Sequence, residues 1–347
     1  MMESYEVCNA FRRKIMKSSL ALAAGSALPR AAMGADAPVV LRCSSAMPVD
    51  QNSAQYLWFE RFRECLRAAV GERIRVDYFP NGQLGKEADV VQQVRLGSID
   101  MMVTGSSIWA TALPELALLD LGYLFDGWAH LARALDGGVA ARFDAMLRER
   151  TGCRVIGWGA FFNARSVYTR NPVTSLAALQ KVKLRVLPTQ IFVDTFRLMG
   201  AIPTPIPFNE VYTAVQTGVV AGFEHDAASV LANKLNEVVG HCWLTEHLFS
   251  ASVAVLGKRA WEKLPLELQA QLLQAAAQAS VYQREVAPQR GQRAMDALRQ
   301  LGLAFHPMRA TERESVRSRM QAQLWPGFTA SYPATRPLLA AIEAARA

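Results

Sequence analysis

Segments typical of strands alternate with segments typical of helices along this chain, and this order restricts the folds open to it. Residues 39–46, 73–79 and 99–105 have strand character, while residues 53–70 and 87–97 carry apolar side chains at helical spacing. Gly97 stands where a helix commonly ends in the left-handed conformation. The resulting βαβαβ order predicts an α/β domain with a largely parallel sheet.

A second set of alternating segments follows and predicts a second α/β unit. The predicted strands are residues 153–161, 166–170, 183–187 and 219–227. The predicted helices are residues 175–180, begun by Ser175, residues 189–200, ended by Gly200, and residues 209–218, capped by Asn209. Prolines hold residues 202–210 extended. Residues 264–302 then form one long helical region, interrupted only by Pro288, which could brace both units.

The N-terminus has the pattern of an export signal. Basic residues between Arg12 and Lys17 precede a short apolar run, and Ala32-Met33-Gly34 fits a cleavage site before Ala35. The stretch FRRKIMK resembles a twin-arginine signal, but it also fits a plain secretory signal, and both readings stay open. The apolar run is too short to span a bilayer. We therefore expect a periplasmic protein without residues 1–34.

Charge and cysteine content narrow the class of partner. The net charge is +8, and residues 1–34 hold five basic and two acidic groups, so the remainder carries +5. No block of Lys and Arg with interleaved aromatic residues occurs, which argues against nucleic-acid binding and leaves attraction of small anions. The cysteine spacings match no zinc or redox motif. We expect mostly buried thiols, with a Cys153–Cys242 bridge as the alternative.

Motifs of common enzymes are missing from the sequence. It contains no GxGxxG, Walker A, HExxH, GxSxG or CxxC pattern. The stretch HCWLTEH (241–247) is rich in metal-binding residue types, but its spacing does not bring them onto one helical face. We therefore predict a protein that is not an enzyme and has no cofactor or metal.

Two arginines in the second unit are candidates for binding an anion. Arg165 comes shortly after a predicted strand, and Arg185 lies between apolar residues in the strand KLRVL. Strand alternation allows Arg185 to point either to solvent or into a cleft. A buried guanidinium requires a partner, and it matches a carboxylate through two parallel hydrogen bonds. That partner is either a protein side chain or a ligand. Nearby aromatic residues, Trp158 and Phe208 among them, belong either to the core or to the wall of a pocket.

Several stretches together resemble the solute-binding subunits of tripartite ATP-independent periplasmic (TRAP) transporters, of the dicarboxylate-receptor type. The most specific is DTFRLMGAIPTPIPFNEVYTAVQTGVVAGFEHD (194–226), which follows the strand KLRV. DYFPNGQLGKEADVVQQVRLGSIDM (77–101), RNPVTSLAALQKVKLRV (170–186) and LGKRAWEKLPLELQAQLLQAA (256–276) extend the similarity over nearly all of the chain after the signal. Val182 departs from the family pattern, where a glycine is usual.

The resemblance implies a receptor of the periplasmic-binding-protein type. Two α/β domains, joined by hinge strands and a long bracing helix, would close on a small organic acid and deliver it to integral-membrane subunits. The expected domains are residues 35–162 with about 251–290, and residues 163–250 with about 291–347. Two alternatives stay open: an exported enzyme with His225 and Asp226 as an acid–base pair, and a receptor for a sensor kinase.

The resemblance also implies roles for individual residues. Arg185 matches the arginine that pairs with the ligand carboxylate, and Arg165 matches a second arginine of the family. Phe208 matches an aromatic wall, and the loop with Glu224 and His225 matches the segment that closes on the ligand. The predicted ligand-binding set is Arg185, Arg165, His225, Phe208, Ser44, Asn52, Ser106, Trp158 and Glu224. His225 stands where many relatives have asparagine and Asp226 where many have proline, so a relative's ligand does not transfer directly.

Overall fold

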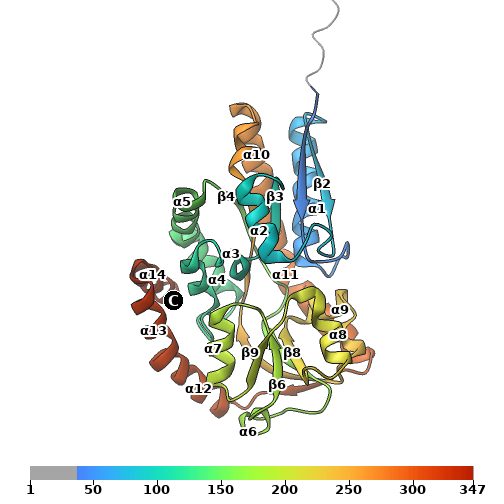
Figure 1. The fold of residues 1–347 in the computed structure, drawn as a ribbon, viewed down its shortest axis with the longest axis vertical. Helices are drawn as coiled ribbons and strands as arrows, with labels where there is room; N and C mark the ends of the chain where they lie inside the picture. Colours follow the sequence, from blue (N-terminus) through green and yellow to red (C-terminus); the bar gives the residue numbers. More distant parts are fainter. Residues whose placement is uncertain (1–36, 347) are drawn as a thin grey trace, which may run out of the picture. The chain divides into compact units, whose positions relative to one another are not determined.

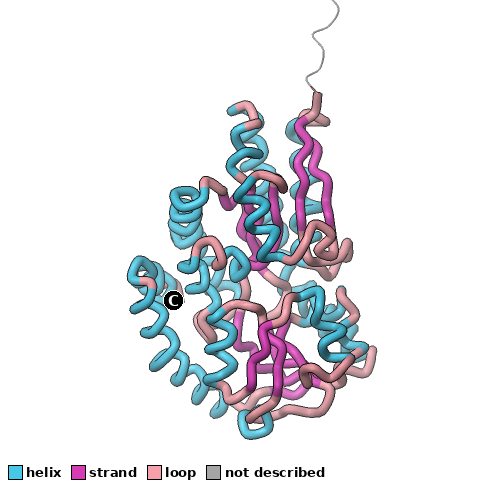
Figure 2. The backbone as a smooth tube through the Cα atoms, in the orientation of Figure 1, coloured by secondary structure: helices cyan, strands magenta, loops and turns pink. Residues whose placement is uncertain are grey.

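Two β-sheets organise the part of the chain that the computed structural model describes, residues 37–346. The first sheet has the strand order β2-β1-β3-β10-β4, and the second has the order β11-β9-β5-β8-β6-β7. Figures 1 and 2 show both sheets with helices around them, which confirms the predicted α/β class. The predicted export signal, residues 1–34, lies outside the described residues.

The first sheet begins with the predicted βαβαβ order. Its strands β1, β2 and β3 pair in parallel, and β10 runs antiparallel to β3 and β4. Helix α2 ends at Gly97 with φ 77, as its position in the sequence predicts. These elements are β1 (Val39–Ser44), α1 (Ala54–Val70), β2 (Ile74–Phe79), α2 (Glu87–Leu96), β3 (Met101–Gly105), β4 (Arg154–Ala160) and β10 (Ala251–Leu256).

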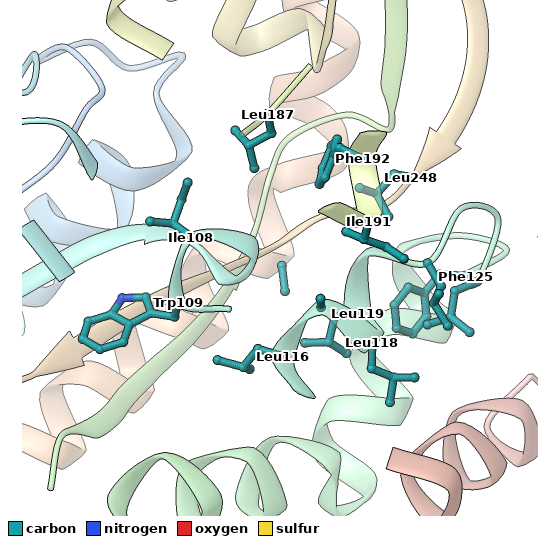
Figure 3. Packing of buried hydrophobic residues seen from close by; sticks show 14 of the residues in the cluster. Ile108, Trp109, Leu116, Leu118, Leu119, Phe125, Leu187, Ile191, Phe192 and Leu248 are labelled. Atoms are coloured by element: carbon teal, nitrogen blue, oxygen red, sulfur yellow. The ribbon is translucent and has the colours of Figure 1, made fainter. Parts of the chain in front are cut away.

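A helical segment connects β3 to β4. It contains α3 (Ser106–Trp109), η1 (Pro114–Asp120), α4 (Trp128–Ala134), η2 (Leu135–Val139) and α5 (Ala140–Thr151). Its apolar residues pack with residues that follow β6 and with the end of β9 in one hydrophobic cluster. Figure 3 shows Ile108, Leu118 and Leu119 in this cluster together with Phe192 and Leu248. Because burial of each such side chain is worth about 1.5–3 kcal/mol, this cluster ties the segment to the second sheet.

The second sheet mixes parallel and antiparallel pairs. Strand β5 runs antiparallel to β8 and β9, while β6 runs parallel to β7 and β8. Its strands are β5 (Arg165–Thr169), β6 (Lys183–Val186), β7 (Ile202–Pro205), β8 (Gly222–His225), β9 (His241–Leu248) and β11 (Ala304–Pro307). Its helices are α6 (Leu176–Leu179), α7 (Gln190–Leu198), η3 (Phe208–Glu210), α8 (Val211–Gln216), α9 (Ala227–Ala232) and η4 (Leu235–Glu237).

Two predicted helix starts have different outcomes. The Ser175 side chain accepts a hydrogen bond from the backbone N–H of Ala178, which confirms it as the cap of α6. The prediction for Asn209 is wrong, because a 3₁₀ turn at Phe208–Glu210 precedes α8 and places Asn209 inside that turn. Asn209 therefore does not occupy the N-cap position of α8, which is held by Glu210.

Helix α11 (Leu266–Gln300), which follows α10 (Lys258–Glu262), is the predicted long helix and contains Pro288. It packs against α1 and β4 and also against α9, the helix that follows β8, so it contacts both the first sheet and a helix next to the second. The Oε1 atom of Gln283 accepts the backbone N–H of Ala160 at 2.9 Å. A Cβ at Gly291 would lie 2.2 Å from the carbonyl oxygen of Phe162, so only glycine permits this approach.

The chain passes between the sheets three times: through two short connections, from β4 to β5 and from β9 to β10, and through α10 and α11 from β10 to β11. The backbone N–H of Phe161 in the first connection donates to the carbonyl of Ser250 in the second at 3.1 Å. After β11 come α12 (Ala310–Arg319), η5 (Met320–Leu324), α13 (Trp325–Ser331), η6 (Pro333–Thr335) and α14 (Arg336–Ala344). None of the helices within residues 37–346 has both the length and the hydropathy that a membrane span requires.

The four cysteines within residues 37–346 are unpaired thiols. Cys43, Cys153 and Cys242 are buried, and Cys65 is partly buried. The alternative of a Cys153–Cys242 bridge is wrong, because these two thiols belong to different hydrophobic clusters.

Candidate functional site

Arg185 on β6 is fully buried, with an exposed fraction of 0%. Of the two directions that strand alternation leaves open for Arg185, the one toward solvent is therefore wrong. Its Nε donates to the carbonyl of Ile206 at 2.8 Å, while Nη1 and Nη2 have no hydrogen-bond partner among the described residues. The nearest carboxylate oxygen, on Glu224, is 3.9 Å from Nη1 and too far for a hydrogen bond. Burial, with help from the Arg165 charge, lowers the pKa of Arg185 to about 10, so it remains a cation at neutral pH.

Arg165 at the start of β5 has a protein partner instead. Its Nε and Nη2 atoms donate to the two carboxylate oxygens of Glu224 at 2.6 and 2.9 Å, a bidentate pair between adjacent strands. Burial alone would raise the pKa of Glu224, but Arg165 and His247 hold it well below its usual range. Burial likewise opposes the charge on Arg165, and Glu224 outweighs it and raises the pKa of Arg165.

His247 on β9 completes this buried group. Its Nε2 lies 3.5 Å from the Oε2 atom of Glu224, and its Nδ1 lies 2.9 Å from the hydroxyl of Thr245. Burial lowers the pKa of His247, so the ring is neutral at neutral pH. The Glu224 carboxylate is therefore shared between Arg165 and a neutral imidazole, and it leaves no short contact for Arg185.

His225 is the last residue of β8 and is also buried. Its Nδ1 lies 2.8 Å from the carboxylate of Asp226, which caps helix α9 by accepting the backbone N–H of Ser229 at 3.0 Å. The ring centre of His225 lies 5.0 Å from that of Phe208. Burial and the charge of Arg165 lower the pKa of His225, so it is neutral at neutral pH.

A small cavity of about 20 Å³ lies among these residues. Arg165, Phe208, His225 and Leu187 line it from the second sheet and the residues that follow its strands. Gln55, Glu87, Gly105, Ser107 and Ile108 line it from the other side, and Phe161 and Ser250 line it from the connections. A cavity of this size has room for about one water molecule. A larger solute can therefore enter only when the two walls separate.

An outer pocket of about 210 Å³ adjoins this cavity. Glu87, Ile108 and Phe208 line both, so they form the partition between them. The guanidinium carbon of Arg185 lies 5.9 Å from the ring centre of Phe208. Phe208 therefore lies close to the Arg185 guanidinium and also lines both the small cavity and the outer pocket.

The structure brings together part of the predicted ligand-binding set. Arg165, Phe208 and His225 line the cavity, and Glu224 and Arg185 lie directly behind them. Ser44, Asn52, Ser106 and Trp158 do not line it. Ser107 takes the place expected for Ser106, and Gln55 on α1 takes that of Asn52, which lies in the turn before the helix. Trp158 packs instead near Phe143, with ring centres 6.4 Å apart.

Sequence reasoning did not single out Gln55, Glu87 or Ser250. Glu87 is the first residue of α2, directly after the QLGK turn, and its carboxylate accepts the hydroxyl of Thr104 at 2.5 Å. Burial raises the pKa of Glu87. Ser250 lies in a connection between the sheets, and its buried hydroxyl has no partner among the described residues. The sequence did contain a feature that could have identified Glu87, because polar residues that follow a strand and a turn are commonly found at ligand sites.

Comparison with known proteins places this geometry in a family. Residues 45–328 match the family described as DctP, bacterial extracellular solute-binding protein, family 7. A solute-binding protein of Roseobacter denitrificans is 35% identical over 68% of this chain and 72% of its own length. The 2,3-diketo-L-gulonate-binding periplasmic protein of Escherichia coli is 29% identical over 84% of this chain and 88% of its own length.

A solved structure shares the fold. A TRAP periplasmic solute-binding protein from a Sulfitobacter species, with bound alpha-D-taluronate, has a TM-score of 0.81 and 28% identity, and the match covers 88% of this chain and 97% of that protein. Since the family model spans most of the sequence, the chain belongs to family 7 of the bacterial extracellular solute-binding proteins.

Proposed function

We propose that this protein captures a hydroxylated monocarboxylic acid, such as a sugar acid, between its two sheets and delivers it to the membrane subunits of a TRAP transporter. The observation that carries the proposal is Arg185, a fully buried guanidinium whose Nη1 and Nη2 have no partner among the described residues. A carboxylate would accept two hydrogen bonds from these nitrogens and offset the cost of burying the charge.

The charges around the cavity favour an acid with one carboxylate. Glu224 already neutralises Arg165, so Arg185 is the one cation of this buried group without a short carboxylate contact. A second ligand carboxylate would face Glu87 on the opposite wall, where like charges repel. The relatives named above bind diketogulonate and taluronate, which are monocarboxylic acids and agree with this reading.

Polar groups on the cavity walls suit the hydroxyls of such an acid. Glu87 accepts hydrogen bonds, Gln55 and His225 can donate or accept them, and Ser250 has a buried hydroxyl without a partner within residues 37–346. A plain fatty acid would leave the Ser250 hydroxyl unsatisfied and would not use the remaining hydrogen-bonding capacity of the other three groups, and a buried polar group without a partner costs about 1–3 kcal/mol. We therefore expect the protein to prefer polyhydroxy acids over unsubstituted acids of equal length.

A thermal-shift screen tests this function. Sugar acids such as D-glucuronate should raise the melting temperature, because a ligand at about 100 times its Kd stabilises the fold by about 2.7 kcal/mol. Neutral sugars, C4 dicarboxylates and unsubstituted acids serve as comparisons and should raise it less. The proposal fails if the sugar acids do not bind, or if the dicarboxylates bind more tightly than they do.

Two further parts of the proposal concern domains and export. The domains are residues 35–162 with about 251–290, and residues 163–250 with about 291–347. The strand membership of the two sheets and the two connections at 161–164 and 249–250 support this division. Residues 1–34 would be removed on export to the periplasm, by either of the two routes named above. Sequencing of the N-terminus of the periplasmic protein should give Ala35.

We also propose that the acid leaves unchanged. The His225–Asp226 pair resembles an acid–base pair, but Asp226 is engaged as the cap of α9. Incubation of purified protein with each bound acid, followed by mass spectrometry, should return the acid alone. A product that grows with time would instead favour the exported enzyme.

A further inference from the structure

A buried carboxyl group, Asp120, has no role in the site as described so far. Its exposed fraction is 2%, and neither of its oxygens has a hydrogen-bond partner among the described residues. An ionised carboxylate in such a place costs free energy, because burial removes its hydration and no hydrogen bond replaces the lost water contacts. The group is therefore stable either as the neutral acid or when nearby cations offset its charge.

Its position links it to the buried charges of the second sheet. Asp120 ends η1, and its neighbour Leu119 belongs to the cluster that contains Phe192 and Leu248 (Figure 3). The guanidinium carbon of Arg165 lies 5.3 Å from the ring centre of Phe192. Three residues after Asp120, the backbone N–H of Tyr123 donates to the carbonyl of His247 at 2.8 Å. A backbone hydrogen bond thus joins the segment that carries Asp120 to strand β9, which carries His247.

The charged groups around Asp120 act in opposite directions. Burial raises the pKa of Asp120 to about 7, Arg165 and the hydroxyl of Ser107 lower it, and Glu224 raises it. The other titratable groups of the site are Arg185, Glu87, His225, His247 and Asp226. The two histidines have lowered pKa values for which burial is the main cause, and Asp226 has a lowered pKa because His225 and Ser229 outweigh its burial. These three groups therefore keep one protonation state above pH 6.5.

We propose that Asp120 takes up a proton when the carboxylate ligand binds, so that the acid anion and a proton enter the buried group together. The inference rests on the proposed function. A ligand carboxylate on Arg185 would add a negative charge beside Glu224, which lies 3.9 Å from Nη1 of Arg185 and whose charge already favours the neutral form of Asp120. Binding therefore takes up protons near pH 7, and affinity rises as the pH falls from 8.5 to 6.5.

Calorimetry with D-glucuronate tests this coupling. Affinity is measured at pH 6.5, 7.5 and 8.5, in phosphate and in Tris, whose different ionisation enthalpies reveal proton uptake. A one-unit rise in the pKa of Asp120 on binding, from about 7, would make the wild type roughly sixfold weaker at pH 8.5 than at pH 6.5. Asp120→Asn should remove the pH dependence and the difference between buffers, and it should bind at pH 8.5 as the wild type binds at pH 6.5.

Two comparison variants separate Asp120 from its surroundings. Glu87→Gln should keep the pH dependence, even if it weakens binding. Ser107→Ala retains Asp120 but removes a hydroxyl that favours its ionised form, so the midpoint of the pH profile should move to higher pH. Ser107→Ala also serves if Asp120→Asn does not fold.

The outcomes are distinct. An unchanged pH dependence in Asp120→Asn, its loss in Glu87→Gln, or an unmoved midpoint in Ser107→Ala overturns the proposal. Binding of D-glucuronate by the wild type without proton uptake overturns this inference and leaves the proposed function standing. If neither D-glucuronate nor any other sugar acid binds, the proposed function fails and this inference fails with it.

Discussion

Strands β5 and β6 each place an arginine in the same buried space, yet the two side chains are in opposite situations. Arg165 donates two short hydrogen bonds to the carboxylate of Glu224. Arg185 is the more deeply buried of the two, at 0% against 3% exposure, and its two terminal nitrogens have no partner among the described residues. One arginine therefore stabilises the protein as it stands, while the other carries a cost that an anionic ligand can offset.

This difference shows why burial alone does not identify a binding residue. Both arginines follow the same rule, that a buried charge needs a counter-charge, but only Arg165 meets it within the protein. The carboxylate that could serve Arg185 is engaged by Arg165 and approached by His247, and it stays 3.9 Å from Nη1 of Arg185. The pairing of Arg165 with Glu224 thus leaves Arg185 without a short carboxylate contact, and substitutions at the two arginines should have separate effects.

The largest expected effect is on affinity, through Arg185. Arg185→Ala should weaken binding of D-glucuronate by about 3–5 kcal/mol, because the ligand carboxylate would be desolvated without a partner. The melting temperature of the ligand-free variant should stay near or above that of the wild type, since an unpaired buried charge has been removed. Arg185→Lys should also bind weakly, because it cannot form two parallel hydrogen bonds.

Arg197→Ala is a matched control. Arg197 on α7 is exposed and pairs with Asp194 at 2.8 Å within the same helix, so its loss should leave affinity unchanged. Calorimetry on all three variants makes the measurement. Wild-type affinity in a folded Arg185→Ala protein would show that the carboxylate binds elsewhere.

The next effect is on stability, through the partner of Arg165. Glu224→Gln should lower the free energy of unfolding by about 3 kcal/mol at pH 7, because it leaves Arg165 buried without a counter-charge. The pKa of Glu224 is lowered in the folded state, so its contribution is present above the unfolded pKa of about 4.3 and is lost as the pH falls further. The difference between wild type and variant should therefore shrink in acid.

Urea unfolding at pH 7 and at pH 3.5 measures this difference. Glu210→Gln, a change at an exposed glutamate, is the control and should have a small effect at both pH values. Equal stability of wild type and Glu224→Gln at pH 7 would mean that the bidentate pair does not stabilise the fold, and the contrast between the two arginines would lose its basis.

The contrast also explains how much of this site could be predicted from sequence. The α/β class, the long helix and the strand that holds Arg185 follow from periodicity and from the resemblance, because regular elements leave a local pattern. That Arg165 rather than Arg185 would pair with Glu224 could not be predicted, since it depends on the register between β5 and β8. The positions of Gln55, Glu87 and Ser250 on the cavity wall could not be predicted either, because they depend on how loops and connections between the two sheets meet.

A smaller effect is expected at His225, which lies beside Phe208 and is hydrogen-bonded to Asp226. If its second nitrogen faces the ligand, His225→Asn should change the rank order of sugar acids, with differences of about 1 kcal/mol for one hydrogen bond. If it only orders the loop, all ligands should bind more weakly by the same factor and the melting temperature should fall. Because burial lowers the pKa of His225 below 6.5, its loss should not alter the pH dependence of binding above that value.

The smallest effect is expected at an exposed pair that joins the two sides of the outer pocket. Lys86, just before α2, lies 2.8 Å from the carboxylate of Glu210 at the end of η3, and both side chains are about half exposed, at 54% and 47%. This pair holds the closed walls together, but water and salt screen it far more than they screen the Arg165–Glu224 pair. Lys86→Ala should therefore speed release of D-glucuronate by a small factor at low salt, and the factor should vanish in 1 M NaCl.

Lys258→Ala is the matched control for this pair, because Lys258 is similarly exposed but pairs with Glu262 within one helix. Stopped-flow displacement gives the release rates. The double substitution Lys86→Glu with Glu210→Lys should restore slow release, because the two positions again carry opposite charges that attract each other. If Lys86→Ala releases ligand at the same rate as Lys258→Ala at low salt, the pair does not hold the walls, and closure depends on the buried contacts of Phe208 and Arg185 alone.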